Sequence, residues 1–480
     1  MKKLNELFDC NYDISIKSLE DDSRTQKENF LFFCIVGLTV DGHDFIEQAV
    51  ANGAVAIVAS KRIETTVPVI YVEDTNKAMW NTLNKFYDNV LDKVKLIGVT
   101  GTEGKTTTTT VIYQILNKLS LNCGLIGSNG VTYGDYFKDY HHTTPNQNQI
   151  FESLSEFQKR GCKYAAIEIA SERLLTGRLD AMQVDIAVLT NINREHLNSH
   201  KTMENYVDCK LKMFKNLKPN SVAIINNDSR YKELFIGSAD NNIITCALDS
   251  ESDLMAKDIV VKQDGLEFTL TGKYGEHKIT TPLTARYNVY NILSIIAVCV
   301  SCGADITSII EALKTASPVI GRNHFLDYGQ KYKVIIDYAH SPNALKNILE
   351  YAREITPAGN KVITVTSSAG GRDIEKRYEM GKFTCDLSNH VIFTTDDARN
   401  EDPNKIIDDL LKDVTTTNYE RELDRRLAIK KAIEMTNDGD TVLIAGRGND
   451  SHIPIKDKLI PFNDIEVTSE LVKEKIANNN

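Results

Sequence analysis

Short apolar runs recur along the chain from about residue 93, and longer polar or helix-like stretches separate them. Continuous apolar runs are typical of strands that are buried on both faces of a sheet. Where such strands alternate with helices, the pattern predicts a mainly parallel, doubly wound sheet. The first series of runs is KLIGVT, CGLIG, YAAIEIA, DIAVLTN, SVAIIN and NIITCAL, and the second is KVIIDYAH, KVITVTSS, HVIFTTDD and TVLIAGRG.

The segments around these series predict an α/β protein of three domains. Before them, LFFCIVG and VAIVAS predict strands, and FIEQAVANG predicts a helix that ends at Gly53. The segment GLEFTLTGKYGEHKITT predicts a hairpin at the edge of the first sheet, and a long helix from about Asn288 closes that unit. A chain of 480 residues is too long for one core. We expect a small N-terminal α/β cap at 1–91, a central P-loop domain at 92–316 and a Rossmann-like C-terminal domain at 317–480.

Composition narrows the class of protein. The net charge of −10 argues against a nucleic-acid partner. Nine scattered cysteines are typical of reduced core thiols in a cytoplasmic protein, and Cys299 and Cys302 lie in an apolar helix pattern rather than in a metal site. The N-terminal sequence has no signal-peptide pattern, and no apolar run approaches the roughly 20 residues that span a bilayer. We therefore expect a cytoplasmic protein without membrane insertion.

The segment VKLIGVTGTEGKTTTTTVIYQIL, residues 94–116, predicts a phosphate site. A strand, a glycine turn and a helix start direct several backbone N–H groups, and the helix dipole, at one point. Lys105 would reach terminal phosphates there, and Thr106 would bind magnesium. The loop is short, because Val99 stands where the usual pattern has its first glycine. The alternative is an ordinary strand–turn–helix with a surface lysine.

Three residues of the first series are weaker candidates when taken alone. Glu168 ends a predicted strand, where open parallel sheets bind ligands, so it is either a metal ligand or a solvent-exposed carboxylate. His196 follows the next strand. Lys210 shares a helix face with Tyr206 and Phe214, and a lysine in that setting commonly extends its amine to solvent.

The second series adds cations and a strand-end carboxylate. Asp337, after KVIID, suits a ribose or phosphate contact, and Arg322 lies near the predicted domain junction, where it could reach the phosphates from the other side. Arg372 stands with two further cations in GGRDIEKR, which predicts either an anion site or a solvated helix face.

Taken in order, these motifs resemble those of the Mur ligases, ATP-dependent amide ligases of peptidoglycan precursor assembly. The short GTxGKT loop is this family's own form. The resemblance extends over nearly the whole chain, through DSR at 22–24, DGHDFI at 41–46, GTEGKT at 101–106, TTP at 143–145, EIASERLLTGRL at 168–179, NINREHLNSH at 191–200, YVDCK at 206–210, ARYNVYN at 285–291, GRNH at 321–324, DYAHSPNAL at 337–345, GGRDIEKR at 370–377 and DDARNEDP at 396–403.

The resemblance implies a ligase that adds a diamino acid to UDP-MurNAc-L-Ala-D-Glu through an acyl phosphate, with ATP and Mg²⁺ as cofactors. Its implied partners are these small molecules, the chain is expected to be a monomer, and the C-terminal domain is expected to close over the loop. Meso-diaminopimelate is favoured over L-lysine, because a guanidinium at Arg399 would match the distal carboxylate of diaminopimelate. The alternatives are that Arg399 pairs with Glu401 or Asp402, or that Asp397 attracts a lysine ammonium.

The resemblance also implies a role for each site residue. Those implied in catalysis are Lys105, Lys210, His196 and Arg322. Those implied in ATP binding are Gly101, Thr102, Gly104, Lys105, Thr106, Thr107, Asn291, Arg322 and Asp337, and those implied in metal binding are Thr106, Glu168, His196 and a carbamylated Lys210. The UDP-MurNAc-dipeptide would contact Ser23, Thr143, Thr144, Ser171 and Arg178, and the amino acid would contact Arg372, Asp396, Asp397, Arg399, Gly446 and Asp450.

Several positions depart from the family pattern. The family's usual residues are replaced at Glu103, Glu172, Glu195, Asn198, Asn343, Asp397 and Ala398. The changes at Glu172 and Asp397 motivate one alternative, a paralogue that joins an amino acid to a different carboxylate acceptor. Another alternative is a nucleotide-binding regulator without turnover. Against the regulator stands the retention of Lys105, Glu168, His196 and Lys210. The N-terminal cap argues against a folylpolyglutamate synthetase-like enzyme, since those enzymes lack it.

Overall fold

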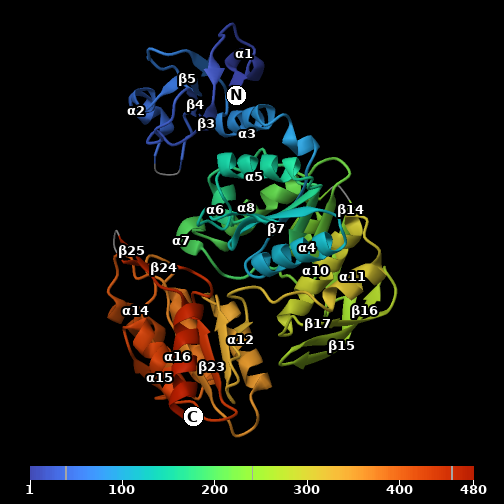
Figure 1. Ribbon diagram of the computed structural model, residues 1–480, viewed down its shortest axis with the longest axis vertical. Coiled ribbons are helices and arrows are strands. Elements are labelled where there is room, and N and C mark those ends of the chain that lie inside the picture. The colour runs from blue at the N-terminus through green and yellow to red at the C-terminus, as the bar shows by residue number, and fades with distance from the viewer. Residues whose placement is uncertain (38–39, 240–241, 456–457, 480) are drawn as a thin grey trace.

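The computed structural model describes residues 1–37, 40–239, 242–455 and 458–479. Three large sheets, of four, eleven and six strands, follow one another along the chain and along the long axis of the molecule (Figure 1). Helices and parallel strands alternate through most of the chain, so the predicted α/β class is confirmed. No helix in these ranges is long and apolar enough to cross a bilayer.

The N-terminal unit has a parallel sheet of order β3-β4-β5-β6. Its strands are β3 (Ser18–Glu20), β4 (Phe30–Phe33), β5 (Ala54–Ala59) and β6 (Val69–Tyr71), which confirms the two predicted strands. The predicted helix is α2 (Ile46–Ala51), and the chain turns at Gly53 with a φ of +109°. The other elements here are β1 (Lys2–Lys3), α1 (Leu4–Leu7), β2 (Ser15–Ile16), η1 (Gly42–Phe45), α3 (Thr75–Phe86) and η2 (Val90–Asp92).

The central sheet has eleven strands in the order β10-β9-β8-β11-β7-β12-β13-β14-β15-β16-β17. Its parallel middle consists of β7 (Lys95–Thr100), β8 (Cys123–Gly127), β11 (Tyr164–Glu168), β12 (Ile186–Leu189), β13 (Val222–Asn226) and β14 (Asn242–Ala247). The predicted hairpin is β16 (Gly265–Gly272) with β17 (His277–Thr281), and it extends the sheet beyond β15 (Leu254–Lys262). The hairpin of β9 (Gly130–Tyr133) and β10 (Tyr136–Lys138) forms the opposite edge.

Helices cover both faces of the central sheet (Figure 1). Its first face packs on α4 (Lys105–Lys118), α10 (Tyr287–Ser301) and α11 (Ile306–Leu313). The second face packs on α5 (Gln147–Lys159) and α8 (Met203–Lys215), with the short helices α6 (Ser171–Leu175), α7 (Leu197–His200) and α9 (Lys232–Ile236) nearby. Cys299 and Cys302 are buried in the first of these cores, which confirms their expected packing role.

The C-terminal unit has a six-stranded sheet of order β18-β19-β23-β20-β21-β22, parallel except at β18. The strands are β18 (His324–Phe325), β19 (Lys333–Asp337), β20 (Val362–Thr366), β21 (His390–Phe393), β22 (Tyr419–Arg421) and β23 (Thr441–Ala445). One face packs on α12 (Pro342–Ile355), α13 (Glu375–Leu387) and α14 (Pro403–Leu411), and the other on α15 (Arg425–Glu434) and α16 (Asp464–Asn479). The hairpin of β24 (His452–Ile455) and β25 (Lys458–Pro461) precedes α16.

Candidate active site

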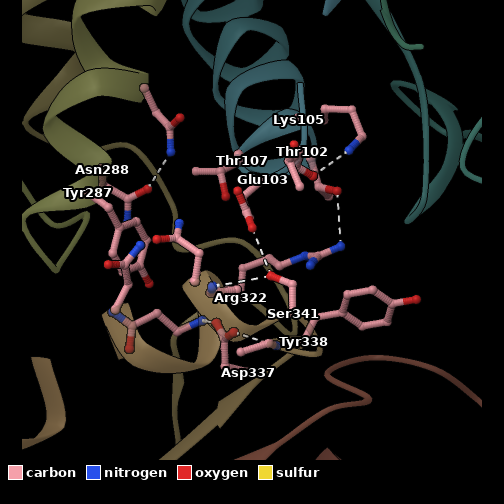
Figure 2. A pocket seen from close by; sticks show the side chains of 18 of the residues that line it. Thr102, Glu103, Lys105, Thr107, Tyr287, Asn288, Arg322, Asp337, Tyr338 and Ser341 are labelled. Carbon is pink, nitrogen blue, oxygen red and sulfur yellow. Dashed lines mark hydrogen bonds between the residues drawn. The ribbon is translucent and has the colours of Figure 1, made fainter. Parts of the chain in front are cut away.

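A cavity of about 1840 Å³ lies where the central and C-terminal units meet. It exceeds the roughly 300–1000 Å³ of a typical small-molecule pocket, so it has room for a nucleotide and a second substrate together. Its lining includes the loop between β7 and α4, the carboxyl end of β11, the start of α10 and the loops that flank β19. In Figure 2 the loop before α4 faces side chains of the C-terminal unit across this space.

The loop between β7 and α4 has the geometry of a phosphate cradle. Gly101 has a φ of +149°, and a Cβ there would lie 1.9 Å from the Thr190 hydroxyl oxygen, so the position requires glycine. Gly104 is the N-cap of α4, with a φ of +84°. Lys105 is not a surface lysine, because its amine donates to the carbonyls of Gly101 and Thr102 at 3.0 and 2.9 Å (Figure 2). Burial lowers the pKa of that amine.

A polar network joins the first turn of α4 to the end of β11. The Thr106 hydroxyl donates to Glu168 Oε2 at 2.9 Å, and the backbone N–H of Ser128 donates to Glu168 Oε1 at 2.8 Å. Arg322, from the C-terminal unit, donates to the Thr106 hydroxyl at 3.1 Å. Glu168 is therefore a buried carboxylate beside the phosphate loop, and the alternative of a solvent-exposed strand end is wrong.

Lys210 lies on α8 and is only 1% exposed. Its amine donates to the Gly101 carbonyl at 2.8 Å and lies 4.8 Å from the centre of the Tyr206 ring. The alternative that it extends to solvent is therefore wrong. Burial, with the nearby charge of Lys105, lowers the pKa of the Lys210 amine well below its usual value. A neutral amine is the form that can react with CO₂ to give a carbamate.

His196 is the N-cap of α7 and has a φ of +58°. Burial lowers the pKa of its imidazole to about 2, so the ring is neutral. Its Nδ1 lies 3.6 Å from Glu172 Oε1 and has no hydrogen-bond partner in the part of the chain that the structure describes. Among the described residues, no group of three or more His, Cys, Asp and Glu side chains is arranged to hold a metal ion by itself.

The predicted nucleotide-binding residues outside the phosphate loop also line the cavity, and so does Thr107. They are Asn291, Arg322 and Asp337. Asn291 donates to Asn288 Oδ1 at 2.8 Å on α10. Asp337, at the end of β19, accepts hydrogen bonds from the backbone N–H groups of Asn323 and Ala339 at 2.5 and 2.8 Å, and burial raises the pKa of its carboxyl. The Arg322 guanidinium lies 4.2 Å from the centre of the Tyr338 ring (Figure 2).

Three of the predicted acceptor residues line the cavity, and two do not. The Thr143 hydroxyl accepts from Ser128 Oγ at 3.1 Å, the Thr144 hydroxyl donates to the Glu168 carbonyl at 2.7 Å, and Ser171 Oγ lies 3.0 Å from His200 Nε2. By contrast, Ser23 donates to Gln48 Oε1 at 2.7 Å, and Arg178 forms an ion pair with Asp21; neither is part of the lining.

Of the predicted amino-acid residues, only Arg372 lines the cavity, where it lies 3.3 Å from Glu172 Oε1. Asp396 forms a buried ion pair with Arg447, which keeps the pKa of its carboxyl below the usual range. Gly446 has a φ of +121°, and a Cβ there would lie 3.3 Å from Ser367 Oγ and 3.6 Å from Asp396 Oδ2. Burial raises the pKa of Asp450 to about 6.

Two expectations about charged side chains of the C-terminal unit are wrong. Arg399 lies 3.2 Å from Asp397 Oδ2, so its partner is neither Glu401 nor Asp402, and Asp397 already has a cation beside it. Glu401 instead pairs with Arg377, which is fully buried and also contacts Asp409. Lys376 is buried too, against Glu195, so the three cations of GGRDIEKR do not form one anion site.

Ser128 and Tyr338 are two of the lining residues for which the sequence predicted no role. Ser128 follows the run CGLIG and holds both oxygens of Glu168, at 2.8 and 3.3 Å. Tyr338 follows Asp337 and lies beside Arg322. Both stand just after the carboxyl end of a parallel strand, and that position was the available signal.

Comparison with known proteins agrees with this geometry. Three family models match the chain in order: the Mur ligase family catalytic domain at residues 15–87, the Mur ligase middle domain at 99–299 and the Mur ligase glutamate ligase domain at 321–448. Among solved structures, one of a UDP-N-acetylmuramoyl-L-alanyl-D-glutamate–2,6-diaminopimelate ligase aligns at a TM-score of 0.70 with 26% identity over 99% of both chains. A folylpolyglutamate synthase of Mycobacterium tuberculosis shares the fold at a TM-score of 0.64 and 15% identity, over 76% of this chain and 91% of that one.

Curated relatives are similar over almost their whole length. The UDP-N-acetylmuramoyl-L-alanyl-D-glutamate–2,6-diaminopimelate ligase of Bacillus cereus is 36% identical over 490 residues, with 99% of each chain covered. The enzyme of the same name from Geobacillus thermodenitrificans is 38% identical over 468 residues, with 96% of this chain and 95% of the relative covered. The chain therefore belongs to the Mur ligase family and is an ATP-dependent amide ligase.

Proposed function

We propose that the chain adds meso-diaminopimelate to the D-glutamate carboxylate of UDP-MurNAc-L-Ala-D-Glu, in peptidoglycan precursor synthesis. The observation that carries the proposal is the convergence of Lys105, Glu168, Lys210 and Arg322 on one large cavity beside the phosphate loop. These residues come from distant segments and from two units. The names of the full-length relatives supply the acceptor and the amino acid.

The reaction requires an activated carboxylate, because a free carboxylate is a poor electrophile. A D-glutamate carboxylate oxygen forms a bond to the γ-phosphorus of ATP, the bond to the β,γ-bridging oxygen breaks, and ADP leaves. The amine of the diamino acid then attacks the acyl carbon, loses a proton and expels phosphate through a tetrahedral intermediate. Lys105 and Arg322 lie where cations would reduce the repulsion between the acceptor and the phosphates.

The residues at the loop fit a requirement for Mg²⁺. Thr106 and Glu168 present oxygen atoms beside the phosphate cradle, as Mg²⁺ prefers. Glu168, the Nδ1 of His196 and the buried Lys210, whose amine has a lowered pKa, fit a second position, provided that Lys210 is carbamylated and so carries a carboxylate. Bound there, the ions would neutralise charge on the phosphate oxygens.

The remaining assignments extend this proposal. Thr143, Thr144 and Ser171 would bind the dipeptide, and Ser23 and Arg178 would bind the uridine-bearing part further away. Arg399 would pair with the distal carboxylate of diaminopimelate, in competition with Asp397, while Asp396, Gly446 and Asp450 complete that site. We assign domains to residues 1–91, 92–316 and 317–480, and we expect a cytoplasmic monomer.

One observation favours a second candidate, a paralogue that uses a different carboxylate acceptor. Glu172 and Arg372 face each other at 3.3 Å inside the cavity, and a carboxylate at Glu172 would repel an acidic group of the acceptor. This candidate keeps the same ATP chemistry and changes only what is joined.

Phosphate release tests the proposal directly. The chain is incubated with ATP, Mg²⁺ and UDP-MurNAc-L-Ala-D-Glu, and then with meso-diaminopimelate or L-lysine at equal concentration, and products are identified by mass. We expect release that depends on both substrates, a preference for diaminopimelate, and loss of that preference in Arg399→Ala. Release without amide product, no release, or a lysine preference in the parent would contradict the proposal.

A further inference from the structure

Three glutamates of the central unit contact the C-terminal unit across the cavity; we refer to Glu103, Glu172 and Glu195 as the interface carboxylates. Glu103 Oε1 accepts a hydrogen bond from the Ser341 hydroxyl at 2.8 Å (Figure 2). Glu195 lies 2.8 Å from the amine of Lys376, and Glu172 lies 3.3 Å from Arg372. All three stand at positions that depart from the family pattern.

Glu103 is fixed on its own side of the interface by both its backbone and its side chain. Its backbone N–H donates to Asn191 Oδ1 at 3.0 Å, and its carbonyl accepts from the Thr190 hydroxyl at 2.6 Å. Its second carboxylate oxygen accepts from Asn193 Nδ2 at 2.8 Å. Only Oε1 therefore remains to reach the other unit, and its direction is set by the phosphate loop.

Ser341 is equally fixed on the opposite side. It is the N-cap of α12, where its oxygen accepts from the backbone N–H of Ala344 at 3.2 Å while its hydroxyl proton goes to Glu103. The Glu103 carboxylate thus lies near the N-terminal ends of α4 and α12, one from each unit. Both helix dipoles favour a negative charge there, whereas burial raises the pKa of the Glu103 carboxyl.

The contact between Glu195 and Lys376 reinforces this connection. The two side chains are only 5% and 3% exposed, and Lys376 also donates to the carbonyl of His340 at 3.0 Å. Movement of the C-terminal unit would break this contact, so the pair helps to fix the position of that unit. Arg372 and Glu172 are more exposed and contribute less.

We propose that Glu103 is a positioning residue, which holds α12 of the C-terminal unit on the phosphate loop through Ser341. Together with the Glu195–Lys376 pair, it favours the closed arrangement, in which the two units meet at the cavity, before substrates bind. The claim about how the two units are held together does not depend on the proposed function. The effect on turnover rests on the proposed function, in which Arg322 and Asp337 bind the nucleotide from the C-terminal unit.

The proposal is tested by replacing the hydroxyl donor at position 341 with a carboxylate, which can only accept hydrogen bonds. Ser341→Asp retains an N-cap oxygen for α12 but turns a carboxylate toward Glu103. We expect a larger radius of gyration by small-angle scattering and a rise of about tenfold in the KM for ATP, since one charge-assisted hydrogen bond is lost. Glu103→Gln added to Ser341→Asp should restore both values, because the new amide N–H can donate to the introduced carboxylate.

Ser341→Thr is the matched control, since it keeps the cap and the hydroxyl donor, and it should retain the parental radius. If Ser341→Asp does not fold, Glu103→Asn alone, which is shorter and uncharged, should give the larger radius. Parental radii in the folded variants, or no restoration in the double variant, would overturn the proposal. A chain that releases no phosphate would refute the proposed function, yet the scattering result would still decide the role of Glu103.

Discussion

At the scale of single residues, burial makes ordinary side chains chemically unusual. Lys210 would be a poor metal ligand as an ammonium, but its buried amine has a strongly lowered pKa and lies beside the phosphate loop. We predict that Lys210→Ala loses activity by about a hundredfold or more, because charge stabilisation at the phosphates is removed.

Short carboxylates such as acetate should recover part of that activity, since they replace the carboxylate that a carbamate would supply. Lys212→Ala is a suitable control, because Lys212 lies on the same helix as Lys210, and its amine pairs with Asp180 and does not line the cavity. Phosphate release at several acetate concentrations measures the effect. Parental turnover in Lys210→Ala would refute the assignment.

His340 gives a prediction about stability and pH. Burial lowers the pKa of its imidazole to about 4, against the ordinary 6.5. Between these pH values the unfolded chain binds a proton at this site and the folded chain does not, so acid favours unfolding. The free energy of unfolding should fall by up to about 2 kcal/mol from this group between pH 6.5 and pH 5.

His340→Asn should remove that contribution while retaining a donor for the Tyr338 carbonyl. Urea denaturation at the two pH values, in parent and variant, isolates the effect from the other titrating groups. Equal losses of stability in the two proteins would show that His340 does not titrate in this way.

At the scale of elements, the central site depends on how neighbouring strands end. β8 and β11 pair in parallel, so Gly127 at the end of β8 lies beside Glu168 at the end of β11. A Cβ at Gly127 would lie 2.3 Å from Glu168 Oε1. We predict that Gly127→Ala displaces this carboxylate and lowers activity by at least about tenfold, with the fold retained.

The double variant Gly127→Ala/Glu168→Ala checks the cause. If the alanine methyl acts only through Glu168, the double variant should be no less active than Glu168→Ala alone. Additive losses in a phosphate-release assay would instead show a separate effect of Gly127 on the strand.

The elements themselves could be predicted from sequence because apolar runs and helix periodicity are local. The run CGLIG coincides with β8, and the edge hairpin lies in the segment that the sequence predicted. The partners of charged residues were not predictable, since they depend on contacts between distant segments. Ser341 is 238 residues from Glu103, and the full burial of Arg377 has no local signal in a run of three cations.

At the scale of the whole molecule, the boundaries between hydrophobic cores do not coincide with the boundaries between sheets. One core joins the N-terminal unit to a face of the central sheet, and Trp80 of α3 packs edge-on against Phe151 of α5 at 4.8 Å. The two cores of the C-terminal sheet consist almost entirely of residues after 324. The N-terminal and central units should therefore unfold together, and the C-terminal unit should unfold separately.

Calorimetry of the ligand-free chain should show two transitions. Trp80→Ala should destabilise the transition of the joint N-terminal and central units by about 3–5 kcal/mol and leave the other unchanged, whereas Phe393→Ala, buried in the C-terminal unit, should do the reverse. A non-hydrolysable ATP analogue with Mg²⁺, at about a hundred times its Kd, should raise the midpoint temperatures of both transitions. The reason is that Lys105 and Arg322 belong to different units and line one cavity. If Trp80→Ala shifted both transitions equally without ligand, the C-terminal unit would not be an independent folding unit.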